Sequence, residues 1–223
     1  MAAPVTFWRP WSLYQEGIVD ATAHLLETSK RHHIKRFIYI SSESVLQEKG
    51  SLLGASECTA YPNEPNSYYG KSKMLAEKLL LADKGAIDKI IIRPTFIWGP
   101  DLPTLDTLQE KITRKQFMWI DKGEVTMEMV HADNVAELIS LTITKGQDKD
   151  IFFVTDDQSK TAKVFLTDLL TTQGITIPNN SIPGKIARPL AAVVEKLWKG
   201  LRLSSTPPMT HFDLAFIAQV KRP

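Results

Sequence analysis

The stretch Ser67–Pro94, "SYYGKSKMLAEKLLLADKGAIDKIIIRP", changes its hydrophobic pattern halfway and thereby indicates the fold class. Residues 67–84 carry apolar side chains at helical spacing, and Ser67 is a residue type that caps helix N-termini. Residues 88–100 open with a run of isoleucines typical of a strand buried on both faces, and they close in a Gly-Pro turn. We therefore predict a helix followed directly by a buried strand.

The same alternation continues on both sides of this stretch. Upstream, residues 12–33 predict a helix, residues 34–42 ("IKRFIYISS") a buried strand, and residues 43–66 a long loop. Downstream, the patterns predict helices over 103–116, 133–144, 160–174, 183–203 and 207–220, and strands over 117–121, 124–132 and 150–156. Strands that alternate with helices imply an α/β fold with a parallel sheet covered on both faces.

The composition argues against several classes of protein, among them nucleic-acid-binding and disulfide-rich proteins. The chain has 223 residues and a formal net charge of +2, so nucleic acid is not an expected partner. Its single cysteine, Cys58, excludes a disulfide framework or a cysteine metal cluster, and no metal site is predicted. We expect an intracellular, cytoplasmic protein, because no long apolar run and no signal peptide are found in the sequence.

Tyr69 and Lys73 lie one helical turn apart, at the start of the predicted helix 67–84. A nearby ammonium would lower the pKa of a tyrosine from about 10 towards the working range. Ser42, at the end of the preceding strand, could orient a substrate oxygen while the tyrosine moves a proton. Because a Tyr-x-x-x-Lys spacing is common by chance, a solvated surface pair is the alternative reading.

Four blocks of sequence resemble, in order, those of the extended short-chain dehydrogenase/reductases. They are "RFIYISSESV", "YYGKSKMLAEKLL", "IIIRPTFIWGP" and "MVHADNVAELI". The branch most similar is the 3β-hydroxysteroid dehydrogenase-like and NAD-dependent epimerase/dehydratase group. The resemblance implies a Rossmann-like parallel sheet, followed by a small, mostly helical substrate-binding part.

The resemblance also implies roles for individual residues. The catalytic set would be Ser42, Tyr69 and Lys73, with Tyr69 as general acid/base and Lys73 also holding the nicotinamide ribose. The cofactor, NAD or NADP, would be contacted by Tyr69 and Lys73 and by residues of two further segments, Ala2, Ala3, Pro94, Thr95 and Ile97.

One departure from the family pattern concerns the cofactor. The Gly-x-x-Gly-x-x-Gly fingerprint is absent, since the eleven glycines are scattered. We therefore expect an N-terminally shortened family member with an exposed sheet edge. Residues 1–156 would form a partial NAD(P)-binding domain, with 101–132 contributing to the substrate side, and 157–223 a mostly helical cap.

Three functions remain open at this point. The first is an NAD(P)-dependent oxidoreductase that interconverts a secondary alcohol and a ketone on a small, steroid-like or other apolar substrate. The second is a catalytically silent binding or regulatory protein, and the third a sugar-nucleotide epimerase or dehydratase. Residues 186–203 are expected to form either a cap over the substrate crevice or a helix on a membrane surface. The resemblance also allows a homodimer through helix 67–84.

Three other polar residues have simpler explanations. Arg93 is either a phosphate contact or a structural arginine. We expect His131 to be a structural, hydrogen-bonded residue, and Asp133 to cap the helix that follows it.

Overall fold

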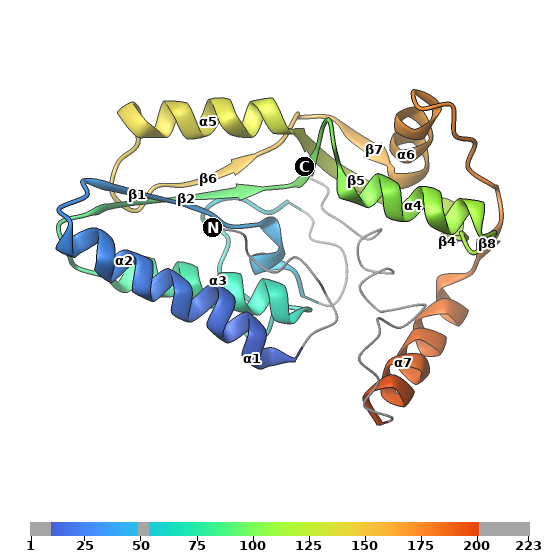
Figure 1. Cartoon of the computed structure of the whole chain (residues 1–223), viewed down its shortest axis with the longest axis horizontal. Helices are drawn as coiled ribbons and strands as arrows, with labels where there is room; N and C mark the ends of the chain where they lie inside the picture. The colour runs from blue at the N-terminus through green and yellow to red at the C-terminus, as the bar shows by residue number, and fades with distance from the viewer. Residues whose placement is uncertain (1–9, 49–53, 201–223) are drawn as a thin grey trace. The chain divides into compact units, whose positions relative to one another are not determined.

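The computed structural model describes residues 10–48 and 54–200 (Figure 1). Ala2, Ala3 and the helix predicted over 207–220 lie outside these residues. The chain divides into two compact units. Within the described residues, the first runs up to Ile97 and resumes at Met129–Asp157, and the second comprises the remainder. The division into a cofactor part and a substrate part stays a prediction.

The first unit is built on a parallel three-stranded sheet. It contains β1 (Arg36–Ile40), β2 (Asp88–Pro94) and β6 (Ile151–Val154) in the order β1-β2-β6. Ile40 pairs with Ile92, and Pro94 pairs with Val154. The central strand β2 is almost wholly buried, as its isoleucine run predicts, whereas β1 is only half-buried along most of its length. The predicted parallel α/β sheet is thus confirmed.

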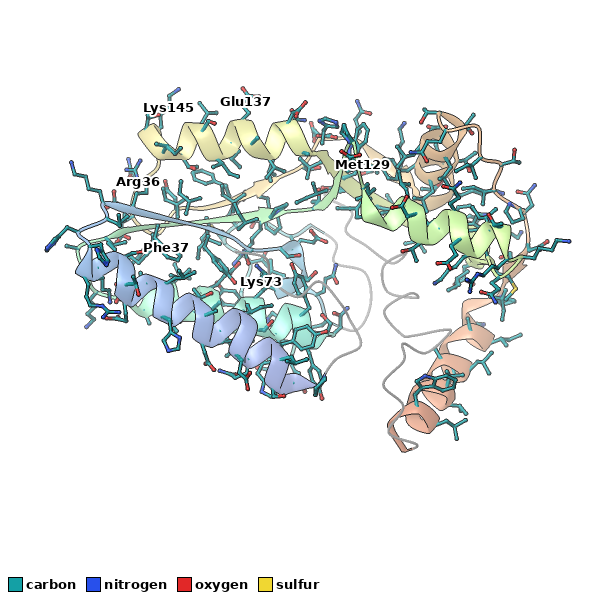
Figure 2. All side chains as sticks on the ribbon, in the orientation of Figure 1. Arg36, Phe37, Lys73, Met129, Glu137 and Lys145 are labelled. Atoms are coloured by element: carbon teal, nitrogen blue, oxygen red, sulfur yellow. The ribbon has the colours of Figure 1, made fainter. Side chains whose placement is uncertain are left out.

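Helices cover both faces of this sheet (Figure 1). On one face lie α1 (Trp11–Tyr14), a π-helical turn η1 (Gln15–Asp20), α2 (Ala21–Arg31) and α3 (Tyr68–Ala82); on the other lies α5 (Ala132–Lys145). The core of the first face includes Tyr14, Ile18, Leu26, Leu80 and Ile91; that of the second includes Ile92, Val130, Val135 and Val154. Glu137 and Lys145 point from α5 away from the sheet (Figure 2).

The first turn of α3 lies directly against the turn that follows β1, a 3-10 segment η2 (Glu43–Leu46). A Cβ atom on Gly70 would stand closer than 3.0 Å to the backbone oxygen of Ser44. Ser67 accepts a hydrogen bond from Gly70 N at 3.0 Å, which confirms it as the helix cap. The glycine therefore permits an approach that any larger residue would prevent.

The N-terminus of α5 differs from the prediction. The cap is His131, whose Nδ1 accepts a hydrogen bond from Asp133 N at 3.2 Å. The expectation that Asp133 caps this helix is wrong, because the helix begins at Ala132 and places Asp133 in its first turn. His131 is structural, as expected: its backbone N–H donates to both carboxylate oxygens of Asp156 at 3.0 Å.

The second unit is rich in helix. It contains α4 (Pro103–Thr113), β4 (Trp119–Ile120), η3 (Asp121–Gly123), β7 (Ser159–Thr161), α6 (Ala162–Thr171), β8 (Ser181–Ile182) and α7 (Gly184–Gly200). Two further strands are β3 (Phe96–Trp98) and β5 (Thr126–His131), and each contains a residue at which the chain passes from one unit to the other. Trp119 is buried, stands edge-on to Phe117, and donates through Nε1 to the carbonyl of Pro178 at 3.0 Å.

Helix α7 buries small side chains and exposes larger aliphatic ones. Ala187 and Ala191 are buried against Ile120 and Ile182. Four larger aliphatic residues at helical spacing are exposed instead: Ile186, Leu190, Val193 and Leu197. Among the described residues, no helix is both long enough and apolar enough to cross a membrane.

The close approach at Gly70 leads to a stability prediction. We expect Gly70→Ala to lower the free energy of unfolding, because overpacking against a backbone atom costs about 1–3 kcal/mol. The higher helix propensity of alanine offsets at most about 1 kcal/mol of this loss in stability. Thermal and urea unfolding measure the difference. Gly85→Ala is the matched control, since its Cβ would meet only the ends of the flexible Asp83 and Lys30 side chains. Equal stability of the Gly70 and Gly85 variants would contradict the tight packing of α3.

Candidate active site

The predicted catalytic serine and tyrosine come together where β1 ends and α3 begins. Ser42 follows β1 and caps η2: its Oγ accepts from Ser44 N at 3.2 Å and donates to Ser44 Oγ at 3.0 Å. Tyr69 lies in the first turn of α3, and its side chain is hydrogen-bonded to that of Ser42. Both side chains are half-buried.

Lys73 lies one turn further along α3 and points into the layer between this helix and the sheet (Figure 2). The residue is only 6% exposed. Its Nζ donates to the carbonyl of Ile40 at 2.7 Å, and lies 4.7 Å from the ring centroid of Tyr39 and 5.9 Å from that of Tyr69. The structure therefore brings Ser42, Tyr69 and Lys73 together within the first unit.

Burial dominates the electrostatics of this cluster. It raises the pKa of Tyr69 to about 12, helped by the carboxylate of Glu43 and opposed by the hydrogen bond with Ser42. Burial also lowers the pKa of Lys73 to about 8, against the opposing charge of Glu77. The expectation of a depressed tyrosine pKa is wrong for this structure, because loss of solvent and the Glu43 carboxylate outweigh the hydrogen bond with Ser42.

The arrangement can therefore present a neutral phenol as a proton donor. A hydroxyl at Ser42 and a cation at Lys73 stand beside it. The Lys73 ammonium offsets part of the cost of forming a tyrosinate when the proton leaves. This combination suits the protonation of an oxygen atom in a substrate.

The residues expected to contact a nicotinamide lie at the carboxyl end of β2. Pro94 is the last residue of β2. Thr95 is buried, and both its N and its Oγ1 donate to the carbonyl of Val154, at 3.2 and 3.3 Å. Ile97 in β3 is 38% exposed and offers an apolar surface.

Two acidic residues near the cluster were missed from the sequence. Glu43 lies next to Ser42 and is buried. Glu77 follows Lys73 by four residues, so helical spacing alone could have placed it on the same face. Glu77 pairs with Arg93, whose Nη2 lies 2.7 Å from the glutamate Oε2. Arg93 is 1% exposed, so of the two alternatives for this residue the structural one is confirmed.

Comparison with known proteins places this chain in a family. Residues 10–183 match the 3-beta hydroxysteroid dehydrogenase/isomerase family. The chain is 34% identical over 84% of its length to the 4-hydroxy-2-methyl-3-oxo-4-farnesyl-3,4-dihydroquinoline-1-oxide ketoreductase of Stigmatella aurantiaca. It is 32% identical over 92% of its length to the decarboxylating sterol-4-alpha-carboxylate 3-dehydrogenase of Dictyostelium discoideum. It spans 57% and 65% of these relatives.

Solved structures show the same fold at lower identity. A dTDP-glucose 4,6-dehydratase double mutant from Streptomyces venezuelae, with NAD bound, superposes with a TM-score of 0.67 at 22% identity; the match covers 82% of this chain and 59% of that one. A UDP-glucose 4-epimerase from Thermotoga maritima gives 0.69 at 21% identity, over 82% of this chain and 62% of that one. The likeness at these identities concerns the fold, whereas the sequence match names the group: the chain belongs to the 3-beta hydroxysteroid dehydrogenase/isomerase family.

Proposed function

We propose that this protein is an NAD(P)-dependent oxidoreductase that interconverts a ketone and a secondary alcohol, with Tyr69 as general acid/base. The observation that carries the proposal is the cluster of Ser42, Tyr69 and Lys73, in which a neutral phenol is hydrogen-bonded to a serine and faces a buried ammonium. Family membership supports it, as do two matched relatives that are named as a ketoreductase and a 3-dehydrogenase.

The residues around the cluster fit the nicotinamide half of the cofactor. The Lys73 ammonium has three N–H donors, and one of them is given to Ile40 O. The others suit ribose hydroxyls, and the exposed side chain of Ile97 suits a nicotinamide face. No described segment has the Gly-rich spacing that cradles a pyrophosphate, so the fit concerns this half alone. A bound reduced nicotinamide would supply the hydride.

In the direction of reduction, the chain's own residues would handle the oxygen atom of the ketone. Ser42 would turn its hydroxyl proton from Ser44 Oγ to the carbonyl oxygen and hold that oxygen near Tyr69. The phenol would give its proton to that oxygen as the carbonyl carbon is reduced, and Lys73 would stabilise the tyrosinate that remains. In oxidation, the tyrosinate would take the proton of the alcohol.

The substrate class we propose is apolar and ring-containing. The names of the two relatives describe a farnesyl-substituted quinoline derivative and a sterol carboxylate. Both are largely hydrocarbon and carry an oxygen function on a ring, which is the group that this chemistry would convert.

The proposal predicts that the purified chain binds the reduced cofactor. We expect NADH or NADPH to raise the melting temperature progressively with ligand excess, because the ligand binds the folded state. Nicotinamide fluorescence measures the same binding. A set of ketosteroids is then added one at a time, and turnover is measured as oxidation of the reduced cofactor. A folded chain that shows neither binding nor turnover with any ketone would refute the proposed function.

The role of Tyr69 predicts the result of removing one oxygen atom. We expect Tyr69→Phe to lower kcat by roughly 100- to 10,000-fold, the usual contribution of general acid–base catalysis, with cofactor affinity retained. Tyr68→Phe is the matched control, because the neighbouring residue is 49% exposed on the same helix. Steady-state kinetics of both variants decide the point, and full activity in Tyr69→Phe would exclude the assigned role.

The buried lysine predicts a pH dependence. The pKa of Lys73 is lowered to about 8, so its ammonium is present below that pH and is lost as the pH rises through it. We therefore expect kcat/KM for ketone reduction to fall above about pH 8. In Lys73→Arg, whose side chain stays charged, the fall should move to higher pH. An unchanged alkaline limb in that variant would assign it to another group.

A further inference from the structure

A bidentate ion pair in the first unit includes Glu77, which follows Lys73 by four residues on α3. The Nε atom of Arg93 donates to Oε1 and Oε2 of Glu77 at 3.1 and 3.2 Å, and Nη2 donates to Oε2 at 2.7 Å. Arg93 is 1% exposed and Glu77 is fully buried. The pair joins the middle of α3 to the end of β2, where Pro94 is the last strand residue and Thr95 follows it.

Two other segments converge on this pair. Tyr61, from the loop before α3, donates through its hydroxyl to Glu77 Oε2 at 2.6 Å and accepts from Arg93 Nη2 at 3.2 Å. The Arg93 guanidinium lies 5.3 Å from the ring centroid of Tyr61 and 5.6 Å from that of Phe153 in β6. Glu57 of the same loop accepts a hydrogen bond from Phe153 N at 2.9 Å. The pair therefore ties the loop, α3, β2 and β6 together.

Stability alone does not account for such a network. Two charges taken out of water lose much of their hydration, and a well-packed apolar pair of the same volume is often as stable or more so. A bidentate arginine–carboxylate pair, in contrast to an apolar contact, adds geometric specificity, because its two parallel hydrogen bonds form in one relative orientation. Tyr69, Lys73 and Glu77 follow one another at four-residue intervals on α3, so fixing Glu77 also fixes the other two.

We propose that Arg93, Glu77 and Tyr61 form a positioning network that sets the place and charge of Lys73. The inference rests on the proposed function where it gives Lys73 a role in catalysis. The position and the titration of Lys73 do not depend on that function. The groups that face Lys73 are Tyr39 and the Ile40 carbonyl from β1, and Tyr69 and Glu77 from α3. Glu77 carries a carboxylate, and it favours the ammonium form of Lys73.

The test replaces both charges by neutral groups of similar volume in Glu77→Gln/Arg93→Met. The titration of Lys73 is followed by NMR of ¹³C-labelled lysine side chains, with its signal assigned from Lys73→Arg. We expect the double variant to fold and its Lys73 pKa to fall, because Glu77 acts on the Lys73 charge directly, whereas Arg93, which is removed with it, is not among the groups that shift this pKa. Asp88→Asn is the control: it breaks the more exposed pair with Arg36 at the other end of β2 and should leave Lys73 unchanged.

The outcomes separate the two proposals. A folded double variant with an unchanged Lys73 titration would overturn the positioning network, whatever the activity. A shifted titration in a chain that never reduces a ketone would uphold the network and refute the proposed function. If the double variant does not fold, Glu77→Asp serves instead, because it keeps the charge but withdraws it from Arg93 by one methylene. We then expect a displaced Lys73 signal, and an unmoved one would refute the inference.

Discussion

The geometry of the candidate site depends on one backbone contact, between the first turn of α3 and the turn that follows β1. Gly70 lies against the carbonyl of Ser44 with no room for a Cβ atom between them. The contact holds the start of a helix and the end of a strand at one fixed separation. Ser42 and Tyr69 flank this point, one from each element, so their hydrogen bond follows from the packing of the backbone.

This close packing also determines the charge state of the site. A phenol and an amine that are removed from water both become harder to ionise, and the pKa of Tyr69 rises while that of Lys73 falls. The two shifts leave the tyrosine protonated and bring the pKa of the lysine to about 8. The carboxylate of Glu43 raises the pKa of Tyr69 further. The carboxylate of Glu77 opposes the lowering of the Lys73 pKa.

Much of this could be predicted from the sequence. The isoleucine run of β2 and the serine cap of α3 are local signals, and the structure has both. The pairing of Glu77 with Arg93 was not predicted, because it joins residues from different elements, and only the fold shows that they meet. The π-helical turn within the first helix and the His131 cap were missed too, since each depends on local geometry that spacing does not specify.

Helix α3 buries charged side chains together with apolar ones on the face that it turns inward. The face that it turns inward carries Met74 and Leu80, as a supporting helix should, but also Lys73 and Glu77. A helix that only filled the core would place apolar side chains at both polar positions, since buried charges cost free energy. Each charge is instead met by a specific partner: the carbonyl of Ile40 for the lysine, and Arg93 for the glutamate. The polar residues are therefore held in defined positions, which the proposed proton transfer would require.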